Sequence, residues 1–162
     1  MVLSVLQQQL GEVHGLALAA AETVDHVDSR VVNRDLRRRL DALRLDAAEL
    51  RGRCLEAEHA YGEELGSEIL AHANTTAEKA AELANAWFKA GTGPLAAWSF
   101  LAMGEAGELS SWAALRSLAE RGGELAELAA WGEEMQRRHL ELVLESVPLV
   151  AELFEPAAPR WG

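Results

Sequence analysis

The chain contains little cysteine, little proline and no long apolar run. Of its 162 residues only one is cysteine, so no disulfide can form within the chain. The four prolines leave long stretches free to form helices, and isoleucine occurs once. Ala, Leu, Glu and Arg dominate instead, which is the composition of a helical protein.

Membrane-spanning and nucleic-acid-binding roles are disfavoured by the same composition. The longest strongly apolar stretch, residues 16–21, is far too short to span a bilayer, which takes about 20 apolar residues. The N-terminus lacks the basic region and cleavage site of a secretory signal, so we expect a soluble cytoplasmic protein.

The formal net charge of -11 argues against nucleic acid or an anionic membrane as partner. The arginine-rich residues 30–53 are interleaved with acids, which predicts an ion-paired, solvated helix face.

Apolar residues recur at helical spacing in four long segments. We predict a turn near Val31 between the first two segments, a turn at Gly122 and Gly123 between the last two, and a helix end at Pro148. The tail, residues 156–162, is predicted to be irregular, and residues 1–155 to form one domain. The four predicted helices cover residues 3–27, 36–65, 94–120 and 123–147.

The long connection between the two helical hairpins decides the predicted topology. Thr75 with Glu78 three residues later has the pattern of a capping box, which predicts a shorter helix to about Ala90. Pro94 is placed as the first-turn proline of the next helix. A connection over residues 66–93 is long enough to cross the bundle, so the sequence predicts an all-α, up-down-down-up four-helix bundle.

Glu105 and His139 are the best candidates for chemistry. The two residues are nearly equidistant from the predicted turn at residues 122–123, so antiparallel helices would place them side by side. A carboxylate buried there needs a partner, a proton or a metal. The helical neighbours of Glu105 are mostly apolar, namely Trp98, Leu101, Ala102, Leu109 and Trp112.

One helical turn before His139 stands Gln136, and the hairpin resembles that of rubrerythrin-type, ferritin-like proteins. In that family each hairpin offers a Glu from its first helix and a Glu-x-x-His from its second, all directed at two metal ions. The resemblance therefore implies that Glu105, Gln136 and His139 occupy ligand positions. Gln136 departs from the pattern because a neutral amide cannot bridge two cations as a carboxylate does.

The first hairpin contains a literal Glu-x-x-His, made of Glu56 and His59, with Glu22 at a spacing typical of the family. A turn near Val31, however, would separate Glu22 from His59 by about 14 Å along the axis. We therefore expect Glu56 and His59 to face solvent.

Four other residues lie level with one another near the middle of that hairpin. They are Glu12 and His14 on the first helix and Asp46 and Glu49 on the second. If a two-metal site exists, its other half would be Glu12 or His14 with Asp46 and Glu49. His14 has apolar helical neighbours and is expected to point partly inward.

Several further side chains are expected to have structural roles. Glu108 and Glu134 are interpreted as surface charges, and Cys54 as a small buried residue. Tyr61 is expected to pack, with its hydroxyl reaching a partner, or else to neighbour a redox site. Four tryptophans are expected to fill the core, namely Trp87, Trp98, Trp112 and Trp131.

Two functional hypotheses follow for Glu105 and His139. In the first, they help to hold iron or manganese in a ferritin-like oxidoreductase that performs oxygen or peroxide chemistry. In the second, they form a buried hydrogen bond that fixes helix register in a non-catalytic bundle, which acts in assembly or partner binding without metal. The sequence has no phosphate loop, dinucleotide fingerprint or Cys-rich metal box. A homodimer is compatible with the large apolar fraction.

Overall fold

Five long helices and no strand make up the part of the chain that the computed structural model describes, residues 2–123 and 125–154. The all-α prediction is confirmed, whereas the predicted tail lies outside the described residues. No helix within the described ranges combines the length and apolarity needed to cross a membrane. The helices are α1 (Val5–Asp28), α2 (Arg34–His59), α3 (Glu63–Trp87), α4 (Pro94–Gly122) and α5 (Ala126–Phe154).

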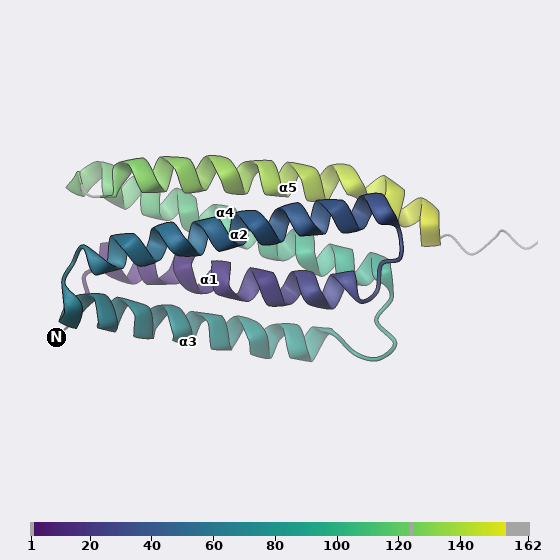
Figure 1. Cartoon of the computed structure of the whole chain (residues 1–162), viewed down its shortest axis with the longest axis horizontal. Helices are drawn as coiled ribbons and strands as arrows, with labels where there is room; N and C mark the ends of the chain where they lie inside the picture. The colour runs from purple at the N-terminus through teal and green to yellow at the C-terminus, as the bar shows by residue number, and fades with distance from the viewer. Residues whose placement is uncertain (1, 124, 155–162) are drawn as a thin grey trace, which may run out of the picture.

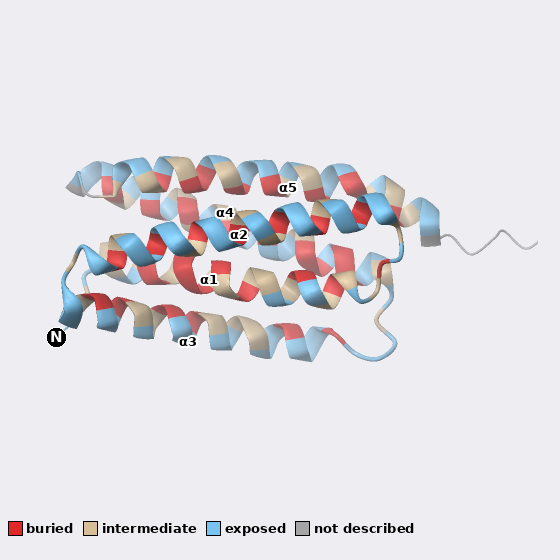
Figure 2. Cartoon of the chain, in the orientation of Figure 1, coloured by how far each residue is buried: buried red, intermediate tan, exposed pale blue. Residues whose placement is uncertain are grey.

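The helices lie along one common axis, and successive helices run in opposite directions (Figure 1). α1 packs against α2, α3 and α4, while α5 packs against α4 and α2. α1, α2, α5 and α4 thus form a closed ring of neighbours, and α3 packs mainly on the outside of α1. Buried residues follow the inward faces, whereas the outer faces of α2 and α5 are largely exposed (Figure 2).

Local signals explain where most helices begin and end. Ser4 caps α1 in a reciprocal capping box with Gln7, and the Asn33 side chain accepts from the first backbone N–H groups of α2. Pro94 occupies the first turn of α4, as predicted. Gly123 and Leu125 both have positive φ, and they close the short turn into α5.

The prediction of a short helix that opens at Thr75 is wrong, because α3 already begins at Glu63. Thr75 lies inside α3 and donates to the carbonyl of Ala71 instead of capping. The buried face of α3 consists mostly of small residues, and it lies against Gly11 and Gly15 of α1. A Cβ on Gly15 would lie 2.3 Å from the carbonyl oxygen of Ala73. The weak hydrophobic pattern therefore reflects close backbone packing, which needs small side chains, and not a loop.

The prediction that Pro148 ends the last helix is also wrong. α5 continues through Pro148 to Phe154, and Val150 beyond the proline is fully buried in the core. An interior proline removes one helical hydrogen bond and costs about 3 kcal/mol in an isolated helix. Burial of Val150 against the bundle offsets part of that cost, so the helix continues.

The core is divided into two apolar clusters along the bundle. One contains Leu43, Leu101 and Val143, and it lies toward the α1–α2 link. The other contains Leu50 and Trp112, and it lies toward the α4–α5 turn. Between these two clusters, α2, α4 and α5 each carry polar side chains that are buried or partly buried, and these side chains form the candidate site.

Candidate functional site

A group of polar side chains separates the two apolar clusters, and we name it the central cluster. Three helices supply its members: α2, α4 and α5. Residues 19–21 of α1 are alanines, two of which share a cavity lining with Glu105 and Glu108, and Glu22 of α1 is exposed. The members of the central cluster are Asp46, Glu105, Glu108, Gln136 and His139.

His139 lies between two carboxylates. Its Nε2 is 2.8 Å from Oδ2 of Asp46 and its Nδ1 is 3.6 Å from Oε2 of Glu105. Glu105 is 2% exposed and His139 is 5% exposed, whereas the Asp46 side chain is 41% exposed and links the cluster to solvent. The predicted meeting of Glu105 with His139 inside the bundle is therefore confirmed, and Asp46 joins them from the first hairpin.

Gln136 ties Glu105 to α5. Its side-chain amide donates to Oε2 of Glu105 and, at 3.2 Å, to the backbone carbonyl of the same residue. Gln136 is fully buried, and its own Oε1 has no hydrogen-bond partner among the described residues. The amide thus occupies the carboxylate oxygen that also faces His139.

The charges around His139 favour its protonated form. Burial alone lowers the pKa of His139, but the hydrogen bonds and negative charges of Glu105 and Asp46 outweigh that effect and raise the pKa above its ordinary 6.5. The imidazolium is then shared between two carboxylates. The arrangement can hold and exchange a proton in the middle of the bundle.

The prediction that Glu108 is a surface charge is wrong, because the residue is only 6% exposed. It lies one helical turn after Glu105, and no hydrogen bond or ion pair engages its side chain among the described residues. Burial, followed by the charge of Glu105, raises the pKa of Glu108 well above its ordinary 4.5. The sequence signal was present: positions 101, 105, 108, 112 and 115 form one helical stripe.

A second buried acid–imidazole contact lies in the other half of the bundle. Nδ1 of His14 is 2.6 Å from Oε1 of Glu58, and both residues are buried. His14 points inward as predicted, but its partner was missed. Glu58 lies four residues after the buried Cys54 on the same stripe, which is the signal that could have identified it.

The register of the first hairpin explains why Glu58 was missed. Arg44 contacts Asp25 and Asp28, and His14 contacts Glu58, so α1 residues meet α2 residues further along the chain than a turn centred at Val31 predicts. The link of residues 29–33 is asymmetric because tight turns extend the end of α1 before Asn33 caps α2. Equal spacing from the turn therefore does not mean equal level in this hairpin.

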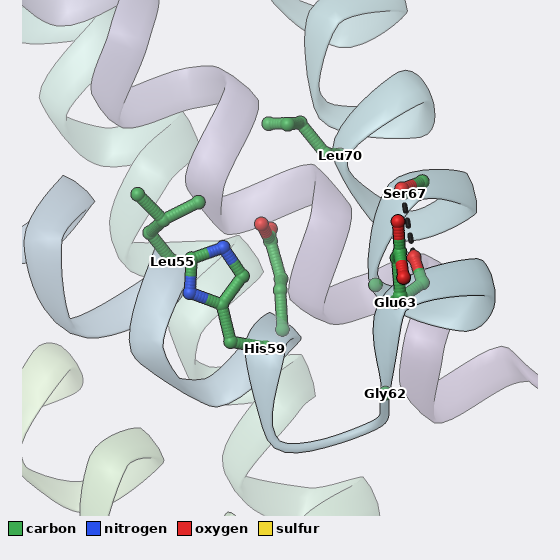
Figure 3. A pocket seen from close by; sticks show the side chains of 8 residues that line it. Leu55, His59, Gly62, Glu63, Ser67 and Leu70 are labelled. Atoms are coloured by element: carbon green, nitrogen blue, oxygen red, sulfur yellow. Dashed lines mark hydrogen bonds between the residues drawn. The ribbon is translucent and has the colours of Figure 1, made fainter.

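A pocket of about 290 Å³ lies beside Glu58 at the turn from α2 to α3 (Figure 3). Leu55, His59, Glu63 and Ser67 line it together with Glu58, and Ser67 donates to the carbonyl of Glu63. His59 is exposed, as is Glu56, in agreement with the prediction for both. Oε2 of Glu58 has no hydrogen-bond partner among the described residues and is shielded from solvent.

The remaining predicted ligands do not gather at the central cluster. Glu12 is half-exposed between α1 and α3, where it accepts from Thr76 at 2.8 Å and lies 3.7 Å from His72. Glu49 is exposed and pairs with Arg53 at 3.2 Å. The predicted grouping of Glu12 or His14 with Asp46 and Glu49 is therefore absent, because the shifted register and the presence of α3 place these side chains in separate environments.

Most donor atoms of the central cluster already contact one another. Both ring nitrogens of His139 face carboxylates, and an amide N–H of Gln136 occupies Glu105. Within residues 2–123 and 125–154, no group of three or more His, Cys, Asp and Glu side chains is placed to hold a metal ion. As arranged, these contacts allow a proton to be shared within the cluster.

A cavity of about 430 Å³ opens beside the central cluster, and we name it the α1–α3–α4 cavity. α1 packs against both α3 and α4, while α3 and α4 have little contact with each other, so α1 forms the floor of the cavity. Glu105 and Glu108 line it at one point, and most other lining residues are apolar or small. The central cluster is therefore accessible from one side of the bundle.

The residues outside the central cluster mostly lie where the sequence analysis expects them. Arg44 pairs with Asp25 and Asp41 on the arginine-rich face, and Glu134 is exposed. Cys54 is fully buried, and burial with the nearby charge of Glu58 raises the pKa of its thiol, which keeps it unreactive. Tyr61 is partly buried against the second apolar cluster. Trp98 and Trp112 fill the core and Trp131 packs beside it, but Trp87 is exposed, contrary to prediction.

Comparison of the chain with protein-family models, with curated proteins and with solved structures gave no match.

Proposed function

We propose that the protein is a ferritin-like, up-down-down-up bundle of α1, α2, α4 and α5 in which α3 is the crossover. Two observations support this topology. α1 with α2 and α4 with α5 form antiparallel pairs, and α3 runs the length of the bundle between them in sequence (Figure 1). The ring of neighbours places α1 beside α4 and α2 beside α5, so residues of three helices meet at the centre.

We infer that this bundle is a non-catalytic binding protein and that the α1–α3–α4 cavity receives a small molecule. The contact that carries this inference is the double engagement of His139 by Asp46 and Glu105. An oxidoreductase of the ferritin-like kind would need these atoms for iron or manganese, and it would need acids where the chain has Gln136 and, on α1, alanines. The central cluster instead fixes the register of three helices and forms a polar wall of the cavity.

Metal analysis of protein purified without chelator tests this function. We expect no stoichiometric iron or manganese, and we expect His139→Ala to lower the melting temperature without changing metal content. His59→Ala is the matched control because His59 is exposed, and it should melt like the parent. Stoichiometric metal that is lost in His139→Ala but retained in His59→Ala would contradict the proposal and favour the oxidoreductase.

A further inference from the structure

The α1–α3–α4 cavity has three acids in a lining that is otherwise mostly apolar or small. Its volume of about 430 Å³ lies toward the lower end of the range typical of small-molecule sites, about 300–1,000 Å³. None of the described residues that line it is Lys, Arg or His. Large apolar side chains come from all three helices, among them Leu16, Leu83, Phe100 and Met103.

Glu108 distinguishes this lining from an ordinary acidic surface. More than nine-tenths of the residue is buried, it lines the cavity, and no hydrogen bond or ion pair engages its carboxyl group among the described residues. The nearby acids are already engaged: Glu105 by Gln136 and His139, and Glu12 by Thr76. A buried carboxyl group without a partner is costly unless it is protonated or meets a cation. The carboxyl group of Glu108 is therefore the group in the cavity that a cationic ligand would contact.

We propose that the α1–α3–α4 cavity binds a small apolar molecule that carries a protonated amine, with the ammonium group donating to Glu108 and the apolar part lying along Leu16, Leu83 and Met103. This inference rests on the proposed function, and it adds the chemical class of the ligand. The carboxyl groups of Glu12, Glu105 and Glu108 in the lining disfavour an anion, and a neutral alcohol would leave Glu108 protonated and form only a neutral hydrogen bond with it. A charge-assisted hydrogen bond in such a site is stronger than a neutral one.

Binding of the ammonium should release a proton from Glu108. The other titratable groups in the cavity lining are Glu105 on the same helix and Glu12 of α1, while α3 contributes only Ala80 and Leu83 to the lining. His139 of α5 contacts Glu105. Because burial and the charge of Glu105 favour the protonated carboxyl, the arriving cation displaces that proton into the buffer and no bond to carbon changes.

Isothermal titration calorimetry of the full chain at pH 7 tests this inference with n-octylamine, n-octanol and n-octanoate. We expect n-octylamine to bind about tenfold more tightly than n-octanol, and n-octanoate not to bind measurably. The enthalpy of n-octylamine binding should depend on the ionisation enthalpy of the buffer, with up to about one proton released per molecule bound. In Glu108→Gln the preference for the amine and the proton release should both disappear. Glu120→Gln, an exposed acid on the same helix, should change neither.

Gly107→Leu supplies a second variant that does not depend on Glu108. Gly107 lines the cavity, and a Cβ there meets no atom within 4 Å, so the longer side chain should occupy the cavity without disturbing the helix. It should abolish binding of both the amine and the alcohol. Alcohol and amine binding of equal strength, both blocked by Gly107→Leu, would overturn the amine assignment and leave the proposed function standing. Binding unaffected by Gly107→Leu, or no binding of any probe, would also overturn the assignment.

Discussion

Two buried acid–imidazole contacts lie in the described part of the chain, and they differ in how closed their surroundings are. His14 and Glu58 form a short pair, and both side chains are almost fully buried. His139 instead shares its two nitrogens between Asp46, which reaches solvent, and Glu105, which lines a cavity. The first pair therefore depends on a single partner, whereas the second belongs to a network that keeps other contacts when one member is removed.

The sharpest way to test this comparison is to remove one imidazole from each contact. His14→Ala leaves the carboxyl group of Glu58 buried without a partner, and removing one member of a buried hydrogen-bonded pair of this kind costs about 3–5 kcal/mol. We expect the largest loss of stability for this variant, measured as the free energy of unfolding in urea at pH 6. The double variant His14→Leu with Glu58→Leu should recover much of the loss, because it removes the uncompensated acid as well. A loss below that of His139→Ala would contradict the comparison.

His139→Ala should cost less, about 1–3 kcal/mol, because Gln136 still donates to Glu105. The loss should also depend on pH. The pKa of His139 is raised in the folded protein, so its stabilising contribution is fully present below the unfolded value of about 6.5 and disappears as the pH rises through the folded value. Urea titrations between pH 5.5 and 9 should show the gap between parent and variant narrowing with pH. A gap that widens toward pH 9 would contradict the assigned charge state.

Glu108→Gln should stabilise the protein in the absence of ligand, by about 1–2 kcal/mol at neutral pH. The pKa of Glu108 is raised when folded, so the parent loses stability as the pH rises from about 4.5 toward that folded value, whereas Gln does not titrate. The advantage of the variant should therefore grow between pH 5 and pH 8, as read from melting temperatures. Glu120→Gln should show no such trend, and an equal trend in both variants would locate the effect elsewhere.

Glu49→Gln should have the smallest effect, about 0.5 kcal/mol or less, because Glu49 is exposed and its one ion pair within the described ranges is with Arg53. Metal content should not change either. The variant tests whether Glu49, which is close to Asp46 in sequence but exposed, behaves differently from the acids of the central cluster. A loss comparable to that of His139→Ala would mean that Glu49 contributes to the interior after all.

The two hairpins also show when a distance along the chain predicts a meeting in space. Glu105 and His139 could be paired from sequence because the α4–α5 turn is short, with Gly123 and Leu125 both in the left-handed region. The same reasoning missed the pairing of His14 with Glu58, because the link of residues 29–33 is asymmetric. Spacing from a turn is thus a reliable guide only where the link between the two helices is short and symmetric.

The burial of Glu108 and the length of α3 show a second limit of pattern reading. Glu108 lies on an apolar stripe, but its charge favoured the surface interpretation until its neighbours on other helices were known. α3 has a weak apolar pattern because its contact with α1 uses small residues, and Gly11 and Gly15 let the two backbones approach closely. Large apolar side chains mark a core in sequence, whereas close packing of small residues does not.

The amino-acid sequence by itself determined the helical class, the start of α4 at Pro94, the inward direction of His14 and the meeting of Glu105 with His139. These features depend on local geometry and helical period, which a single segment or one tight turn sets. Only the tertiary structure decided that Asp46 completes the environment of His139, that Glu58 is the partner of His14, and that a cavity opens beside Glu108. Those contacts join residues of different hairpins or depend on a helix register, and register is set by the packing of whole helices.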